Sequence, residues 1–93
     1  MSESELQARI FKVLSVAKRV RIIELLKQQS LCVNALSNEL GITTAAVSQH
    51  LRILRTAGIV SADKQGYFVF YVLNENTLNK WNRLARNLLE KIE

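Results

Sequence analysis

The stretch LCVNALSNELGITTAAVSQHLRILRTAG, residues 31–58, decides the fold of this chain. Gly41 divides the stretch, because a glycine directly after an apolar helical segment suits the left-handed residue that ends a helix. Thr43 then fits the N-cap of a second helix, where its hydroxyl can accept from the backbone N–H of Ala45 or Ala46. The stretch therefore predicts two short helices joined by a tight turn, the first beginning after Cys32 and the second ending near residues 57–58.

The second of these helices has two different sides. Val47, Leu51 and Leu54 recur at spacings of four and three, which places them on one buried side. The opposite side carries small, amide and cationic side chains, namely Thr44, Ala45, Ser48, Gln49 and Arg52. No Asp or Glu occurs between residues 41 and 62, although a helix that is only solvated usually carries more charged residues of both signs. This side is therefore suited to polyanionic DNA.

Length and charge set the limits on the rest. The 93 residues predict a single domain, 1–93, small enough for a dimer partner to add much of the stability. A net charge of +5 favours nucleic acid or an anionic surface as the partner. The single cysteine excludes an intramolecular disulfide, and neither a signal peptide nor an apolar run of about 20 residues is present. We therefore expect a cytoplasmic protein with no membrane contact.

Two helices are predicted before this stretch. An amphipathic helix follows a frayed start, for which Ser2 or Ser4 can serve as cap; it has Gln7, Arg9 and Lys12 outside and a stripe of Leu6, Ile10, Val13 and Leu14. A central helix over residues 18–28 buries Val20, Ile22, Ile23, Leu25 and Leu26. Its first turn carries Lys18, Arg19 and Arg21, which are either a solvated group or phosphate contacts.

A β-hairpin and a final helix follow. Aromatic and β-branched residues predict strands over residues 59–63 and 67–73, joined by a tip at residues 64–66. Either Phe68 and Phe70 or Val69 and Tyr71 should face the core. Residues 74–93 predict a helix whose apolar stripe exceeds what its own domain needs, so we expect a homodimer in which the first helix takes part. The predicted interface consists of Leu6, Ile10, Leu78, Trp81, Ala85, Leu88 and Ile92.

Four segments together resemble the ArsR/SmtB family of small dimeric transcriptional repressors. They are VRIIELL at residues 20–26, residues 31–60, QGYFVFYVL at residues 65–73 and the helical C-terminus. The resemblance implies a winged helix-turn-helix, which is mainly α with a β-hairpin wing (α+β) and dimerises through its first and last helices. It also implies two recognition helices in successive major grooves of a near-palindromic DNA operator.

The resemblance also implies a set of DNA-contacting residues. Gln49 can pair with adenine, and Arg52 or Arg55 can reach guanine or phosphate. Lys64 and Gln65 at the wing tip would touch the DNA backbone or the minor groove. His50 stands at the family's usual histidine position and is either hydrogen-bonded within the fold or in contact with DNA. The predicted contacts are Thr44, Ala45, Ser48, Gln49, His50, Arg52, Arg55, Lys64 and Gln65.

The metal sites of the family are incomplete in this chain. Relatives have Cys-Val-Cys at the start of the third helix, whereas this chain has Cys32, Val33 and Asn34. The second family site uses Asp, His and Glu on the last helix, which here has neither His nor Asp. Because a soft-metal site needs several thiolates, we expect no metal and no cofactor. Cys32 is either a redox, persulfide or electrophile sensor, favoured by its N-cap position, or a space-filling residue.

These observations predict a sequence-specific DNA-binding regulator, most simply a repressor that an unknown signal releases. One alternative is a winged-helix module that binds proteins, although acids on the recognition side would be expected there. Another is a constitutive DNA-binding protein without an inducer. An enzyme is not expected, because one His, one Cys and no phosphate-binding glycine loop leave nothing to assemble into a catalytic site.

Overall fold

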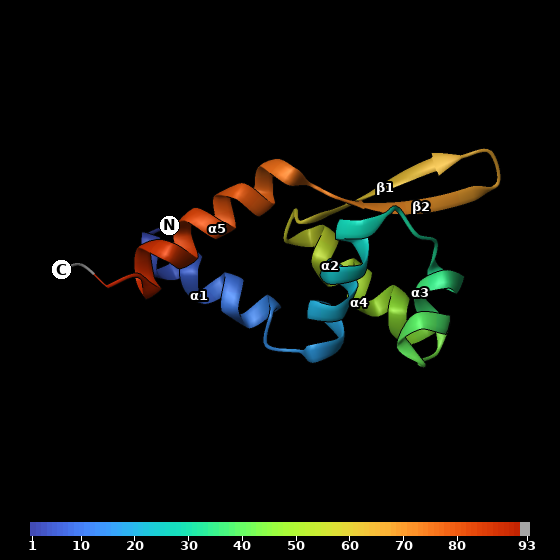
Figure 1. The fold of residues 1–93 in the computed structure, drawn as a ribbon, viewed down its shortest axis with the longest axis horizontal. Helices are drawn as coiled ribbons and strands as arrows, with labels where there is room; N and C mark the ends of the chain where they lie inside the picture. The colour runs from blue at the N-terminus through green and yellow to red at the C-terminus, as the bar shows by residue number, and fades with distance from the viewer. Residues whose placement is uncertain (92–93) are drawn as a thin grey trace.

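The computed structural model describes residues 1–91, which form five helices and one two-stranded hairpin (Figure 1). The elements in chain order are α1 (Glu3–Val13), α2 (Ala17–Gln28), α3 (Val33–Leu40), α4 (Thr44–Thr56), β1 (Val60–Gln65), β2 (Phe68–Leu73) and α5 (Glu75–Leu89). Helices α2, α3 and α4 gather beside the hairpin, whereas α1 and α5 lie side by side and carry both chain ends away from them. This is the predicted winged helix-turn-helix, mainly α with a β-hairpin wing.

Short polar side chains set where three helices begin. Ser2 forms a capping box with Glu5: its hydroxyl accepts from the Glu5 N–H at 3.1 Å, while the Glu5 carboxylate accepts from the Ser2 N–H at 3.2 Å. The first helix therefore starts at Glu3, and the expected frayed start is wrong. Thr43 accepts from the Ala46 N–H at 3.1 Å, as predicted, and Asn74 accepts from the Thr77 N–H at 3.3 Å.

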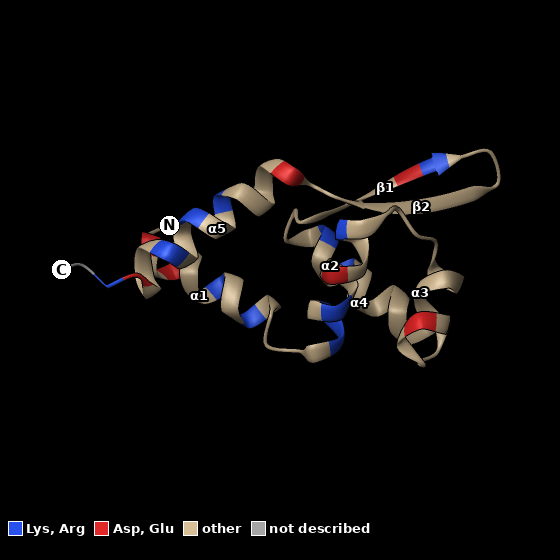
Figure 2. Cartoon of the chain, viewed as in Figure 1, with Lys and Arg blue, Asp and Glu red and all other residues tan. Residues whose placement is uncertain are grey.

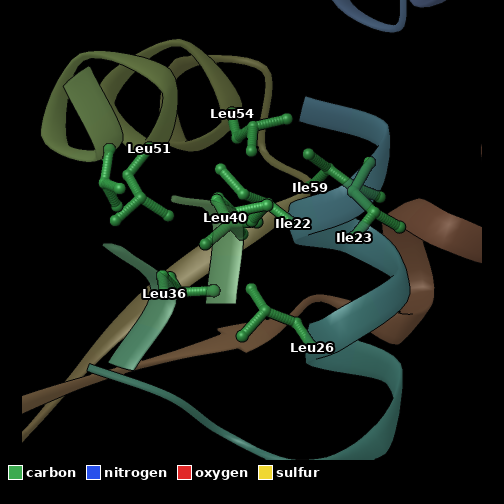
Figure 3. Packing of buried hydrophobic residues seen from close by; sticks show 10 residues of the cluster. Ile22, Ile23, Leu26, Leu36, Leu40, Leu51, Leu54 and Ile59 are labelled. Carbon is green, nitrogen blue, oxygen red and sulfur yellow. The ribbon is translucent and has the colours of Figure 1, made fainter. Parts of the chain in front are cut away.

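The core lies where α2, α3, α4 and the start of β1 meet (Figure 3). Side chains from these elements point toward one another there, and the residues buried completely or almost so include Ile22, Leu36, Val47, Leu51, Leu54 and Ile59. The predicted buried side of α4 is thus confirmed. The prediction for Val20 is wrong, because its side chain is 38% exposed at the edge of α2 beside Phe11 of α1.

The hairpin turns later than predicted. Six antiparallel pairs run from Val60–Leu73 to Gln65–Phe68, so Lys64 and Gln65 belong to β1 and the two-residue turn is Gly66 and Tyr67. Gly66 has a φ of +63°, as the first central residue of a type II′ turn requires. On β2, Tyr71 packs against the core and Phe68 is exposed on the other face. Leu31, just before α3, pairs with Tyr71 through two backbone hydrogen bonds.

Helices α1 and α5 form an arm that two side-chain hydrogen bonds tie together. The Gln7 amide donates to the Leu84 carbonyl oxygen at 3.0 Å, and the Asn87 amide donates to the Glu3 carboxylate at 2.8 Å. Gln7 is only 8% exposed, so the prediction that it lies outside is wrong. Helix α5 ends at Leu89 rather than at residue 93, and Ile92 of the predicted interface lies outside the described residues. None of the helices in residues 1–91 has the length and apolarity to cross a bilayer.

Candidate nucleic-acid interface

The turn between α3 and α4 is held by its own hydrogen bonds. Gly41 has a φ of +65°, and both its N–H and that of Ile42 donate to the Ser37 carbonyl, at 2.9 and 3.3 Å. The Ser37 hydroxyl donates in return to the Ile42 carbonyl. These bonds satisfy the end of α3 and fix the direction in which α4 begins. The orientation of α4 therefore does not depend on a bound ligand.

The three cations at the start of α2 have three different surroundings. The Lys18 ammonium donates to the Leu40 carbonyl at 3.0 Å, at the C-terminal end of α3, where the helix dipole favours a cation. Arg21 forms an exposed ion pair with Glu24 at 3.8 Å. Arg19 has a buried Nε without a hydrogen-bond partner in residues 1–91. Lys18 is thus not merely solvated, because one of its donors is used within the fold, and phosphate contact by these cations stays a prediction.

The exposed side of α4 presents the predicted recognition residues together. All of Thr44, Ala45, Ser48, Gln49, Arg52 and Arg55 are exposed. Within residues 1–91 no hydrogen bond or ion pair occupies the side chains of Ser48, Gln49, Arg52 or Arg55. The neighbouring elements α3 and β1 each carry one acid, Glu39 and Asp63, which are red in Figure 2, whereas α4 itself contains none. This side, which we call the reading face, can offer donors to an anionic ligand without first breaking internal bonds.

Lys64 and Gln65 lie near the tip of the wing but on opposite faces of it. Lys64 pairs with Val69, and Gln65 pairs with Phe68, so their side chains alternate across the hairpin. The Gln65 amide donates to the Asp63 carboxylate at 3.0 Å, which leaves the Lys64 ammonium as the free donor of the two. The tip was predicted at residues 64–66, but the turn consists of Gly66 and Tyr67. Lys64 and Gln65 are instead the last two residues of β1.

His50 lies on the flank of α4 and not with the reading face. It is half-buried, and its Nδ1 is buried with no hydrogen-bond partner among the described residues, so the expected hydrogen bond within the fold is wrong at that atom. Burial, and secondly the positive charge of Arg19, lower the pKa of His50 below its ordinary value. His50 is consequently protonated to a smaller extent at pH 7 than an ordinary histidine.

Cys32 occupies the N-cap position of α3, as predicted, and is half-buried. Its side chain makes no capping hydrogen bond. In the part of the chain that the structure describes, no three His, Cys, Asp or Glu side chains come together to hold a metal ion. The surroundings of Cys32 thus contain neither a second thiol nor a ligand set.

The predicted dimer residues fall into two groups. Ile10 is buried within its own chain, and Leu78 and Trp81 pack partly against the core. Leu6 and Ala85 are half-buried, and Leu88 is exposed on α5.

A hollow of about 720 Å³ opens between α1, α4 and α5. Its lining includes apolar residues such as Trp81 and four cations, namely Arg9, Lys12, Arg52 and Lys80.

Two exposed aromatic residues of the wing were not among the predicted site residues. Tyr67 is fully exposed at the turn, and Phe68 beside it is 64% exposed. A signal for this was present in the sequence, because a glycine between two strand patterns often opens a two-residue turn. That reading would have placed Tyr67 at the apex rather than in a strand.

The fold and the reading face define a winged helix-turn-helix DNA-binding protein. Residues 17–62 match the family described as "Bacterial regulatory protein, arsR family". The chain is 32% identical over 91 residues to the "Transcriptional repressor SmtB homolog" of Synechocystis, which covers 97% of this chain and 69% of that protein. The chain belongs to the ArsR/SmtB family of transcriptional regulators, which is not a family of enzymes.

Two solved structures have the same architecture. Reduced HlyU from Vibrio cholerae is 30% identical, with a TM-score of 0.76 over 95% of this chain and 93% of that one. The homodimeric winged helix-turn-helix DNA-binding domain Mb0332 from Mycobacterium bovis is 26% identical, with a TM-score of 0.74 over 96% of this chain and 83% of that one. Both likenesses extend through the arm, and not only through the helix-turn-helix.

Proposed function

We propose that this protein is a homodimeric repressor that binds a near-palindromic operator with its two α4 helices in successive major grooves. The observation that carries this proposal is the reading face, which is exposed, free of acids and unoccupied by internal hydrogen bonds within residues 1–91. A regulator that covers an operator excludes other proteins from it, so binding alone is sufficient for repression. The repressor names of relatives such as the Synechocystis protein support this sign of regulation.

Each residue of the reading face has a role that its chemistry suggests. Gln49 offers an amide that can pair with both N6 and N7 of adenine, and Arg52 a guanidinium that can pair with O6 and N7 of guanine. Thr44 and Ala45 are small, so the first turn of α4 can approach the groove closely. Arg55 and Lys64 are exposed cations further out, suited to the phosphate backbone.

The second copy is proposed to pack on the arm. Leu88 and Leu89 expose apolar side chains on α5, and Phe11 does so on α1. A two-fold axis through the arms would cover these residues and set the two reading faces at a fixed separation, which a palindromic operator requires. The homodimeric Mb0332 domain, which shares the whole architecture, supports this assembly.

Cys32 is proposed as a space-filling residue rather than as the sensor of an inducing signal. Its half-buried position, without a second thiol nearby, favours this alternative over thiol chemistry. Its rate of alkylation against pH tests the choice. An inert thiol, and a Cys32→Ser protein that releases DNA under the same conditions as the wild type, are expected. A fast reaction together with a Cys32→Ser protein that no longer releases DNA would make Cys32 the sensor.

The operator experiment begins with duplexes selected from fragmented genomic DNA. Gln49→Ala is expected to weaken binding and to lose the preference for the selected sequence, because the adenine contact is lost. Lys64→Ala should weaken binding to all sequences and lower the slope of log K against log salt by about two, because each of the two protomers loses one phosphate contact. Lys27→Ala is the matched control, since Lys27 is an exposed cation at the far end of α2. If both test variants bind as Lys27→Ala does, the reading face is misplaced; if no duplex is selected, a protein-binding module is favoured.

A further inference from the structure

The tip of the wing exposes aromatic side chains that the fold does not use. Tyr67 is fully exposed, Phe68 is 64% exposed, and neither belongs to the core or packs against it. The chain has only six aromatic residues, three Phe, two Tyr and one Trp, so two of them stand at this apex. Aromatic side chains that stay exposed to water do not stabilise the fold of this protomer, because their stabilising effect comes from burial. Their position calls for a surface that covers them.

The hairpin holds these side chains in a defined position. The pair Gln65–Phe68 closes the ladder directly at the turn, and the positive φ of Gly66 leaves Tyr67 as the second turn residue. The rings of Phe68 and Phe70 lie 6.3 Å apart on the same face, so Phe68 is supported from behind. Among residues 1–91, its two chain neighbours apart, no atom lies within 4 Å of the position that a Cβ at Gly66 would take. The apex is thus both ordered and free to enter a narrow space.

The charges around the apex favour a polyanion. Lys64 is exposed with a free ammonium, while the one nearby acid, Asp63, accepts the hydrogen bond from Gln65. Strand β1 contacts α4 directly, so the wing is attached to the helix that carries the reading face. In Figure 1 the hairpin projects from the end of the molecule that holds α3 and α4, away from the arm. The wing and the reading face therefore belong to one end of the molecule.

We propose that residues 66–68 form an aromatic wedge, in which Tyr67 and Phe68 enter the minor groove of the operator, partly unstack one base step and bend the DNA. The minor groove is only about 6 Å wide, and apolar side chains inserted there kink the duplex. Pyrimidine–purine steps such as TA unstack most easily, so the wedge selects the flanking sequence without a base-specific hydrogen bond. This inference rests on the proposed operator binding and extends it to a second determinant of specificity.

The test uses selected operator duplexes that carry 2-aminopurine at the flanking step and a dye at each end. The wild type is expected to raise the 2-aminopurine fluorescence, shorten the distance between the dyes, and prefer a flanking TA step to an A-tract. The double variant Tyr67→Ala, Phe68→Ala should lose all three effects and bind the TA duplex roughly tenfold more weakly. Tyr67→Phe keeps the ring and should retain them. Lys64→Ala should weaken binding without loss of unstacking or bending.

Several results would overturn the wedge. One is a wild-type protein that binds its operator without change in fluorescence or dye distance, which would leave the proposed function standing. Another is a double variant that binds and bends like the wild type. Sedimentation of the proteins without DNA tests whether a second copy of the chain covers the tip instead. If the wild type forms an oligomer larger than a dimer and only the double variant does not, the tip is a contact between copies and not a DNA wedge. A wild type that selects no operator would overturn the proposed function and the wedge together.

Discussion

The ammonium of Lys18, at the start of α2, donates to the carbonyl of Leu40 at 3.0 Å, where α3 ends. Those two residues are 22 positions apart, and the bond attaches the first helix of the core to the turn that orients the reading face. A cation placed there interacts both with an otherwise unpaired carbonyl and with the negative end of the helix dipole. The positive charge of Lys18 consequently acts within the fold.

Lys18→Met tests this role against phosphate contact. We expect the free energy of unfolding to fall by roughly 1 kcal/mol, because a charge-assisted hydrogen bond and a favourable dipole interaction are both lost. Urea denaturation at one fixed protein concentration measures this, with Lys27→Met as the control. The slope of operator affinity against salt should stay as in the wild type. A reduced slope with unchanged stability would instead make Lys18 a phosphate contact.

Gly41→Ala tests the left-handed turn before α4. A Cβ at this position meets no atom of the described residues within 4 Å, its chain neighbours apart, so the cost comes from the φ of +65°. That backbone conformation costs an L-residue roughly 1–2 kcal/mol, and Asn less. Thermal unfolding should therefore rank the wild type above Gly41→Asn and Gly41→Asn above Gly41→Ala. Equal melting temperatures for the three proteins would show that the turn can change its path.

Gln7 tests the link between the two helices of the arm. The variant Gln7→Met keeps the size of the side chain but loses the hydrogen bond to Leu84, which should cost about 1 kcal/mol. Gln7→Glu should cost more, because it places a carboxylate against a carbonyl oxygen in a buried position. Urea denaturation measures both, and Gln28→Met at an exposed site is the control. If Gln7→Glu were as stable as Gln28→Met, Gln7 would not be buried in solution.

His50 should make stability depend on pH. Burial and the charge of Arg19 hold the pKa of His50 below its ordinary value in the folded state, so the unfolded state takes up the proton first as the pH falls. The contribution of His50 to stability is therefore constant above about pH 7.5 and declines as the pH falls below about 6.5.

The titration of His50 can be followed directly, because it is the only histidine of the chain. Its ring proton signal in NMR spectra should titrate below the ordinary range, and Arg19→Gln should raise the pKa, since it removes a nearby positive charge. Between about pH 7.5 and 5.5, the free energy of unfolding of the wild type should decline, and that of His50→Gln should lack this decline. A pKa above the ordinary value would contradict the buried position of His50.

The sequence by itself determined the features whose causes are local. Thr43 caps α4 through a hydrogen bond to a residue three positions later, and Gly41 ends α3. The helical periodicity of α4 places Leu51 and Leu54 on the buried side and Gln49 on the opposite, exposed side. The strand pattern predicted the hairpin, and the four segments together predicted the family. Such features depend on neighbours along the chain, so an ordered list of residues is sufficient to find them.

Only the tertiary structure decided the contacts between distant positions. Gln7 is polar and was therefore expected outside, but it is buried because a backbone carbonyl 77 residues away accepts its amide. Lys18 and Arg19 are adjacent cations, and only folding places one at the end of α3 and the other where its charge acts on His50. Burial and pairing are set by what packs opposite a side chain, and no local pattern specifies the surface that a distant helix will present.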